Sequence, residues 1–449
     1  MELMRVTRRS FLGAMTAAAY QRVLGANDRI QVGFIGYGLI GREHVHDFKM
    51  QKDVDVAALC EVYQPRLEEG LAACGRGAKG YRDFRELLED KDIEAVVIST
   101  PDHWHALMTI LGCAAGKDVY VEKPMTLFIE EGRWMVKAAR RYSRVVQVGT
   151  QQRSGEHYHH ALSLLQGGHL GKIHSARLGA FRNVMPGFGS PPDSTPPPGM
   201  DYDLWLGPAP QRPYNKHRAL YHFRWFWDYS GGQMTNYGSH DLDIVHWAMK
   251  VQGPLAVSSS GGRFALEDNG ETPDTQDALF EYPGFTALWS LREASLGSSA
   301  GSVLEFFGTK GSMSLSREGY EVFPDMRTAP ENQVPQIMGH PAGGVQPHPE
   351  AKPELWTPAL KRRASNPLFV SHVRNFLDCI KSRQRPAADV EDGHRTATAC
   401  HLANISLRLD RKVRWDAAKE EIVGDREAST HLTRPYRKPW DEVLRSVNL

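Results

Sequence analysis

The 449-residue chain has few cysteines and almost no net charge. Its five cysteines are scattered and odd in number, without a Cys-x-x-Cys pair, which argues against a zinc site or a dense disulfide framework and favours buried free thiols. A net charge of +1 gives no reason to expect a nucleic-acid partner. Beyond the N-terminal region, no apolar run reaches the roughly 20 residues that a membrane-spanning helix needs, so we expect no membrane span.

Metal-binding patterns are also scarce. The histidines of HYHH (157–160) and the pair His44 and His46 have no acidic or cysteine partners at the spacing of metal ligands. We therefore expect no metal site and assign these histidines to the surface or the core.

The first 27 residues form a segment of their own. Arg5, Arg8 and Arg9 precede an uncharged stretch, SFLGAMTAAAY (10–20), which is too short to cross a membrane and fits a signal segment. Thr-Arg-Arg-x-Phe-Leu (7–12) resembles the twin-arginine signal that routes folded proteins across bacterial membranes. We expect export to the periplasm by this route. The alternative is an extension that stays attached to a cytoplasmic protein.

Residues 28–150 alternate between short apolar runs and helical stretches, which predicts a doubly wound α/β domain. Five runs are typical of buried parallel strands: 30–36, 54–60, 94–100, 118–123 and 145–150.

After Gln151 this alternation stops, and we expect a second domain over 151–415 followed by a C-terminal tail over 416–449. Proline-rich stretches at 187–199 and 324–367 predict loops. The other predicted elements are a helix at 157–167, a strand at 172–181, several strands within 255–323 with a hairpin turn at GTKG (308–311), and helices at 369–382 and 393–410.

A glycine-rich turn follows the first apolar run. Gly36-x-Gly38-x-x-Gly41 lies between a predicted strand and a predicted helix, the context in which this motif binds a dinucleotide. Gly36 permits the tight turn, Gly38 lets the backbone approach a pyrophosphate, and Gly41 allows close helix packing. Glu61, 20 residues beyond Gly41, ends the second strand, where a carboxylate binds ribose hydroxyls and repels a 2′-phosphate. The pattern favours NAD over NADP, although Arg66 offers a counter-contact.

Two further motifs, STPDHWHA (99–106) and VEKPM (121–125), stand at the carboxyl ends of predicted strands. Ligands bind at that edge in open α/β sheets. Pro124 restricts the backbone of Lys123, and an ammonium group there can stabilise the alkoxide formed as hydride departs.

A third motif, at 225–247, is dense in histidine, aspartate, asparagine and aromatic residues. If 233–248 is helical, Asn236, His240 and Asp243 share one face. A histidine that titrates near neutrality suits removal of a hydroxyl proton, so we expect this role for His240. Asn236 would orient the ring or bind a substrate hydroxyl, and Asp243 would hold the imidazole from behind. Each of these residues has a purely structural alternative.

In combination, GYGLIG (36–41), STPDHWH, EKP (122–124) and the Asn236-x-x-x-His240-x-x-Asp243 pattern resemble the Gfo/Idh/MocA oxidoreductases over about 29–415. The resemblance implies a Rossmann domain followed by an α+β domain with a large open, mostly antiparallel sheet. One face of that sheet often forms the oligomer interface, so we expect a homodimer or homotetramer.

The resemblance also assigns site residues. Lys123 matches the family's catalytic lysine and His240 its catalytic histidine, with Asn236 and Asp243 as their catalytic partners. The residues expected at the cofactor are Gly36, Tyr37, Gly38, Leu39, Ile40, Gly41, Glu61, Arg66, Thr100, Pro101, His105, Glu122, Lys123 and Gln151. The residues expected at the substrate are Lys123, Arg153, Trp225, Trp227, Asn236 and His240, with Arg224 beside them.

The chain departs from the family at Asn236, where aspartate is common. An amide cannot take up a proton, so we expect His240 to carry more of the base role.

These features predict an NAD-dependent oxidoreductase that acts on a secondary alcohol of a sugar, polyol or glycoside and holds its cofactor tightly. One alternative is a redox-neutral enzyme, such as a glycosidase, an epimerase or a sugar–sugar oxidoreductase, that recycles its hydride. The other is a cofactor- or sugar-binding sensor without catalysis.

Overall fold

The computed structural model describes residues 29–297, 301–327, 336–337, 340–341 and 354–447. The expected export segment and part of the predicted loop at 324–367 lie outside these residues.

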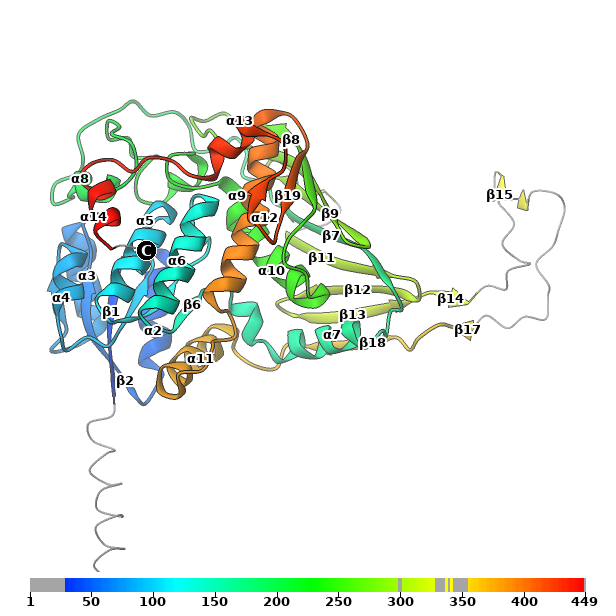
Figure 1. Cartoon of the computed structure of the whole chain (residues 1–449), viewed down its shortest axis with the longest axis horizontal. Coiled ribbons are helices and arrows are strands. Elements are labelled where there is room, and N and C mark those ends of the chain that lie inside the picture. The colour runs from blue at the N-terminus through cyan, green and yellow to red at the C-terminus, as the bar shows by residue number, and fades with distance from the viewer. Residues whose placement is uncertain (1–28, 298–300, 328–335, 338–339, 342–353, 448–449) are drawn as a thin grey trace, which may run out of the picture.

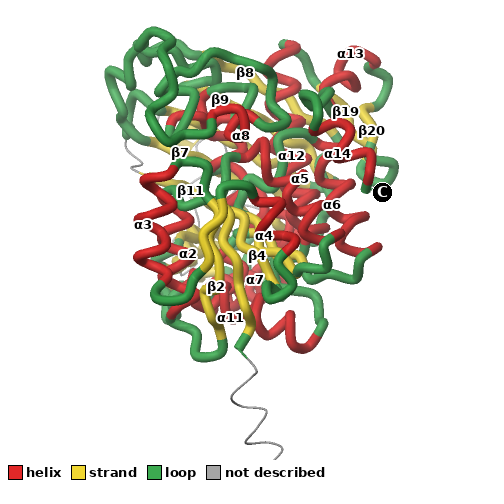
Figure 2. Tube along the Cα trace, turned by 90° about the vertical axis from the view of Figure 1, so that its left-hand side faces the viewer, coloured by secondary structure: helices red, strands yellow, loops and turns green. Residues whose placement is uncertain are grey.

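The first domain is a six-stranded parallel sheet with helices on both faces (Figures 1 and 2). Its strand order, β3-β2-β1-β4-β5-β6, confirms the predicted doubly wound α/β arrangement. The strands are β1 (Ile30–Ile35), β2 (Val54–Cys60), β3 (Lys79–Tyr81), β4 (Ala95–Ile98), β5 (Asp118–Val121) and β6 (Val146–Val148). The helices are α2 (Leu39–Lys49), α3 (Gln64–Cys74), α4 (Phe84–Glu89), α5 (Asp102–Ala114) and α6 (Ile129–Arg141).

The second domain is built on a ten-stranded sheet in the order β18-β13-β12-β11-β7-β10-β9-β8-β19-β20. Only β7 and β10 pair in parallel among the neighbours of this sheet, which confirms a large, mostly antiparallel sheet. Its strands are β7 (Ile173–Phe181), β8 (Ala256–Gly262), β9 (Thr275–Tyr282), β10 (Phe285–Arg292), β11 (Gly301–Gly308), β12 (Gly311–Ser316), β13 (Gly319–Pro324), β18 (Leu360–Arg363), β19 (Val413–Asp416) and β20 (Glu421–Ile422). The GTKG turn joins β11 to β12, as predicted.

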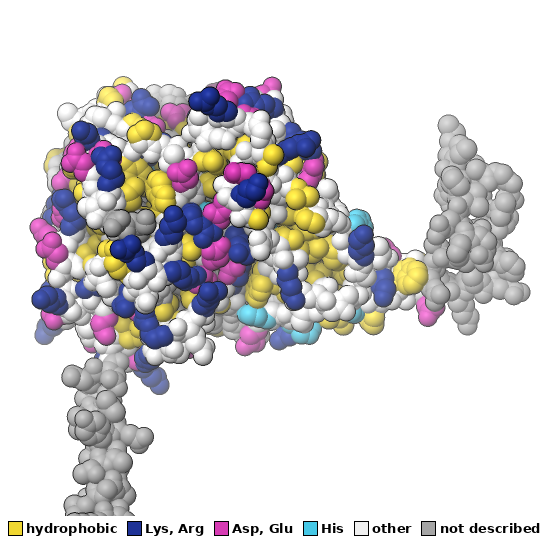
Figure 3. Space-filling view, in the orientation of Figure 1, with side chains coloured by type: hydrophobic (Ala, Val, Ile, Leu, Met, Phe, Trp, Pro, Cys, Tyr) yellow, Lys and Arg dark blue, Asp and Glu magenta, His cyan; other side chains and the backbone are white. Residues whose placement is uncertain are grey.

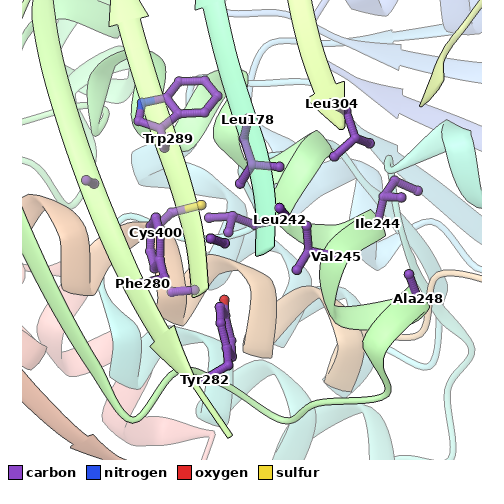
Figure 4. Packing of buried hydrophobic residues seen from close by; sticks show 14 of the residues in the cluster. Leu178, Leu242, Ile244, Val245, Ala248, Phe280, Tyr282, Trp289, Leu304 and Cys400 are labelled. Carbon is purple, nitrogen blue, oxygen red and sulfur yellow. The ribbon is translucent and has the colours of Figure 1, made fainter. Parts of the chain in front are cut away.

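One face of this sheet packs against helices, and the other is open. In β10, alternate residues such as Ala287 and Trp289 are buried while Leu288 is exposed, as the period of two requires. Figure 4 shows Trp289 and Phe280 of the sheet packed with Leu242 and Val245 of α10 (Gly238–Met249). The other helices on this face are α7 (Glu156–Gln166) and α12 (Val390–Leu409).

Helix α12 lies between the two domains (Figure 1) and packs against α6 as well as β8. His401 Nε2 lies 3.1 Å from the carbonyl oxygen of Thr126, and His394 Nε2 lies 3.0 Å from Glu420 Oε1. The first contact joins the segment before α6 of the first domain to α12, and the second joins α12 to the turn between β19 and β20. Helix α11 (Leu368–Ser382) of the second domain also packs on α2 of the first domain.

The C-terminal segment, expected as a tail, packs back onto the first domain. Trp440 opens α14 (Trp440–Ser446) and lies 4.8 Å from Trp104 of α5, ring centre to ring centre. The Tyr436 hydroxyl donates to Glu131 Oε1 at 2.8 Å. This segment contains only short elements, α13 (Arg426–Ser429) and α14 among them, which the sequence does not predict.

Two short edge strands, β3 and β18, are present although the sequence does not predict them. The edge strand β3 was not predicted, because it has only three residues and two of them are exposed. Strand β18 lies within the predicted loop 324–367, where its LKRR sequence offers no apolar run, yet it pairs with β13.

All five cysteines are buried free thiols. Among the described residues, no helix combines the length and apolar character needed to span a membrane, and no cluster of three histidine, cysteine or acidic residues could hold a metal ion. Basic and acidic side chains are interspersed on the face seen in Figure 3.

Candidate active site

A cavity of about 730 Å³ lies between the two domains. The loops after β1, β4 and β5 supply one wall. The opposite wall comes from α9 (Gly232–Asn236), α10, the residues around the 3-10 turn His222–Trp225, and Arg317 in the turn between β12 and β13. The cavity therefore lies at the carboxyl edge of the parallel sheet, where ligands bind in such folds.

The glycine turn shapes one end of this cavity. Gly36 has φ +93°, and a Cβ on it would lie 2.9 Å from the carbonyl oxygen of Ser99. A Cβ on Gly41 would lie 2.4 Å from the carbonyl oxygen of Gly36, so α2 can approach only because this side chain is missing. Gly38, in contrast, has open space around its Cα and lines the cavity. The turn thus leaves an open cradle at the N-terminus of α2, which fits the pyrophosphate of a dinucleotide.

Glu61 lines the cavity beside this turn. Its carboxylate accepts hydrogen bonds from the backbone N–H groups of Tyr37, at 2.9 Å, and Tyr63, at 3.1 Å. Arg66 and Arg42 line the same end, and Arg42 forms an ion pair with Glu69. A fixed carboxylate at this place can accept from ribose hydroxyls.

The middle of the cavity holds a buried hydrogen-bond group around Glu122. This carboxylate accepts from His44 Nε2 at 2.8 Å, from Gln151 Nε2 at 2.9 Å and from the backbone N–H of Lys123 at 3.1 Å. Burial opposes its ionisation, but the hydrogen bond and charge of His44 together with Lys123 outweigh burial and lower the pKa of Glu122. The backbone at Lys123 is therefore held by the ionised carboxylate of Glu122.

His105 is fixed by two carbonyl groups. Its Nδ1 lies 2.7 Å from the Pro124 carbonyl oxygen and its Nε2 lies 2.8 Å from that of Thr100. Because a carbonyl oxygen only accepts, both hydrogen bonds form together only when both ring nitrogens carry a proton. His105 thereby ties the loop after β4 to the loop after β5.

Lys123 meets the second domain through Asn236. Its Nζ donates to Asn236 Oδ1 at 2.8 Å and to the Asn236 carbonyl oxygen at 3.1 Å. Asn236 Nδ2 donates to Gln233 Oε1 at 2.9 Å, and Gln233 Nε2 donates to Glu293 Oε1 at 2.9 Å. Lys123 donates to Oδ1 and Gln233 accepts from Nδ2, so these neighbours determine the orientation of the Asn236 amide.

Desolvation of the ammonium group lowers the pKa of Lys123 to about 8. The carboxylates of Glu122 and Asp102 oppose this effect, while Arg224 and Arg317 add to it. Lys123 is thus divided between its charged and neutral forms near pH 8.

His240 lies in the same cavity and is 6% exposed. Arg317 Nη2 lies 3.3 Å from its Nε2, and because a guanidinium only donates, Nε2 accepts and Nδ1 carries the proton of the neutral ring. Nδ1 has no hydrogen-bond partner among the described residues. Burial, reinforced by Lys123 and Arg317, lowers the pKa of His240 well below its usual value.

The helix predicted at 233–248 is interrupted at Tyr237, between α9 and α10. Asn236 and His240 still face the cavity, but the expected contact between Asp243 and His240 is wrong. Asp243 is instead paired with Arg153, at 2.7 Å, and accepts from Thr396. The buried guanidinium of Arg153 needs a carboxylate, and Asp243 supplies it.

Two residues expected at the substrate lie away from the cavity. Arg153 is 6% exposed, lies over the Trp247 ring and does not line the cavity. Trp227 lies under the guanidinium of Arg408, also away from the cavity. Trp225 does line the cavity, and its Nε1 donates to Glu293 Oε2 at 3.0 Å.

Of the residues expected at the cofactor, Tyr37 and Gly41 support the turn without lining the cavity. The others line it: Gly36, Gly38, Leu39, Ile40, Glu61, Arg66, Thr100, Pro101, His105, Glu122, Lys123 and Gln151.

Sequence analysis missed Arg182, Gln233 and Arg317, which also line the cavity. Arg317 stands in SLSREGY, an ordinary hairpin turn far along the chain, and no motif marks it. Gln233 lies within the 225–247 motif and could have been included as a polar neighbour of Asn236, three residues before it.

Two family models match the sequence. Residues 30–150 match an oxidoreductase family described by its NAD-binding Rossmann fold, and residues 186–260 and 351–442 match the C-terminal α/β domain of the same family, Gfo/Idh/MocA.

Similar proteins cover either most of the chain or about a quarter of it. Myo-inositol 2-dehydrogenase of Thermotoga maritima is 23% identical over 401 residues, covering 88% of this chain and 100% of that protein. A glycosyl hydrolase family 109 protein of a Shewanella species is 34% identical over 122 residues, covering 25% of this chain and 27% of that protein. The WlbA dehydrogenase of Bordetella pertussis, solved with NADH and UDP-GlcNAcA, has a TM-score of 0.62 at 18% identity, covering 86% of this chain and 99% of that one.

Proposed function

From the premise that the chain belongs to the Gfo/Idh/MocA oxidoreductase family, we propose that it interconverts a secondary alcohol of a sugar, polyol or glycoside and the corresponding ketone with NAD. The observation that carries the proposal is one cavity that contains the glycine cradle, Lys123 and His240. The similarity to an inositol dehydrogenase over its whole length supports a polyhydroxylated substrate.

The cofactor would lie along the cradle at Gly38, with Glu61 at a ribose and with His105 and Lys123 at the reacting end. When bound, NAD accepts a hydride from the carbon that bears the hydroxyl group. Glu61 favours NAD over NADP because its carboxylate would repel a 2′-phosphate.

Oxidation also requires the hydroxyl proton to leave. We assign the acceptor role to neutral Lys123, whose pKa of about 8 matches proton exchange near neutral to mildly alkaline pH. In the reverse reaction the protonated amine returns the proton to the alkoxide.

His240 has a different role in this proposal from the one expected from the sequence. Its pKa lies well below the usual value because the ring is buried beside two cations, so it is a weak base. As a neutral ring it accepts, through Nε2, a hydrogen bond from a hydroxyl next to the reacting one, and so orients the substrate with the reacting hydroxyl toward Lys123.

Export through the twin-arginine route remains part of the proposal. A protein that folds before export can take up its dinucleotide in the cytoplasm, so slow cofactor release would follow. Fractionation of cells that express the full chain tests the location, and recovery in the cytoplasmic fraction alone would contradict it.

A redox-neutral reaction is the second candidate. The resemblance of a quarter of the chain to a glycosyl hydrolase family 109 protein supports it, although only 27% of that protein is covered. Product analysis separates the two candidates, because net NADH formation with a ketone product belongs only to the dehydrogenase.

The primary test is spectroscopic. The purified protein is mixed with NAD and a panel of sugars, polyols and glycosides, and NADH fluorescence is followed, including a single-turnover phase for bound cofactor. We expect an alcohol-dependent signal that falls about 10²- to 10⁴-fold in Lys123→Met, the usual contribution of a group that transfers a proton. An unchanged rate in Lys123→Met would contradict the assignment.

A further inference from the structure

Two arginines of the second domain line the cavity without an acidic partner. Arg224 and Arg317 have no carboxylate oxygen within ion-pair distance among the described residues. Arg182, on the same wall, differs because it is neutralised by Glu293. Two cationic groups thus remain available at the end of the cavity where the substrate would lie.

Both guanidinium groups are held in place by aromatic rings and by one polar contact. Arg224 lies 4.7 Å from the centre of the Phe223 ring, and its Nη1 donates to the Tyr221 carbonyl oxygen at 3.1 Å. Arg317, in an exposed turn, lies 5.8 Å from the centre of the Phe369 ring and contacts His240. Stacking on a ring face leaves the N–H groups at the edge of a guanidinium free to donate.

Within the described part of the chain, no carboxylate forms an ion pair with either cation, although Glu318 is close enough to Arg317, and Asp102 to Arg224, for their charges to interact. Lys123 is a third cation, and the residue facing its ammonium group is the neutral Asn236. The nearby acids are engaged: Glu122 by His44 and Gln151, and Asp102 by the Ser230 hydroxyl. Burial also raises the pKa of Asp102, which opposes ionisation of this carboxyl group.

We propose that the substrate carries an anionic group, the carboxylate of a sugar acid or a phosphate ester, which Arg224 and Arg317 bind. This inference rests on the proposed function and narrows its substrate class. Arginine suits the task because its planar fork forms paired, charge-assisted hydrogen bonds with carboxylate or phosphate oxygens.

Binding of such a group would also free Nε2 of His240 for the substrate. Arg317 now donates to Nε2, the atom assigned to a substrate hydroxyl. An anion that attracts Arg317 removes this competing donor and offsets its charge. The same anion would therefore both anchor the substrate and prepare the hydroxyl site.

The test uses matched pairs of acidic and neutral ligands on protein loaded with NADH, where no oxidation can occur. Isothermal titration calorimetry compares glucuronate with glucose, gluconate with glucitol, and glucose 6-phosphate with glucose. We expect at least one acid to bind tenfold or more tightly than its neutral partner, and this preference should shrink as salt is added. The uronate, aldonate and phosphate pairs distinguish the two sources of negative charge.

Variants then assign the preference to the arginines. Arg224→Met and Arg317→Met should each reduce the acid preference at least tenfold, while Arg76→Met, which removes an exposed arginine outside the cavity, should retain it. The inference is overturned if no acid in the panel exceeds its neutral partner, or if both variants keep the preference. NADH binding and turnover of neutral polyols are measured separately, so the proposed function can stand when this inference fails.

Discussion

At the scale of single residues, the chemistry of the site depends on the pairing of Lys123 with an amide. Enclosure lowers the pKa of the lysine to about 8, and a carboxylate at 236 would act in the opposite direction. Asn236 accepts from Lys123 through Oδ1 and donates to Gln233 through Nδ2. The amide therefore holds the lysine in position without restoring the usual lysine pKa.

Asn236→Asp tests this relation. In the native enzyme we expect kcat/KM for oxidation to rise with pH and level off above about 8, because neutral Lys123 accepts the proton. An aspartate raises the pKa of Lys123, so the midpoint should move up by about one pH unit. The variant should also lose about 1–2 kcal/mol of stability, since a carboxylate cannot donate to Gln233 Oε1. The measurements are the pH profile and urea unfolding.

Asn236→Ala is the matched control, since it removes the same hydrogen bonds without adding charge. Its midpoint should stay at or below that of the native enzyme. An alkaline shift of equal size in Asn236→Ala would show that lost positioning, rather than charge, moves the profile.

Sequence alone located Lys123 and His240, because each stands in a motif with a recognisable setting. The roles predicted for Asp243 and Arg153 at the site were wrong, because these two residues are buried against each other instead of facing the cavity. Residues from turns that are distant in sequence, such as Arg317, carry no local pattern. Which polar group partners which buried charge depends on packing between elements, and a one-dimensional pattern does not contain that information.

At the scale of elements, the strands and helices with strong periodicity were predicted close to their observed bounds. The single-residue break at Tyr237 was not predicted, because the sequence GQMTNYGSHDLDIVHW (232–247) is compatible with one continuous helix. Short edge strands such as β3 and β18 were missed because pairing with a neighbour, rather than apolar periodicity, makes them strands. The β1–α2 unit was recognised fully, since its glycines have separate geometric roles.

Two alanine substitutions separate those roles. Gly41→Ala should lower stability and abolish NADH binding, because the new Cβ meets the Gly36 carbonyl at 2.4 Å and forces α2 away. Gly38→Ala has open space, so its melting temperature should stay near that of the native protein while NADH binds about tenfold or more weakly. Thermal unfolding and NADH fluorescence titration check both variants. Equal NADH affinity in Gly38→Ala and the native protein would exclude close approach of the pyrophosphate at this residue.

At the scale of the whole molecule, the site exists only because two domains are locked together. Lys123 comes from the first domain, and Asn236 and Arg317 come from the second. Helix α12 joins the domains at one place, and the C-terminal segment returns to seal Trp440 against the first domain. A chain that ended before this segment would expose the ring of Trp104, whose helix begins beside the cavity.

The open face of the ten-stranded sheet is where we expect copies of the chain to associate. Leu279 of β9 and Leu288 of β10 are paired across the strands, and both are exposed, at 38% and 40%. Adjacent exposed leucines in the middle of a broad sheet favour a protein contact over solvent. We expect native mass spectrometry to show a dimer or tetramer with one NAD per chain, and Leu288→Glu to yield monomers that keep NAD, since the face is remote from the cradle. A monomeric native protein would contradict this prediction, and an oligomer unaffected by Leu288→Glu would place its interface elsewhere.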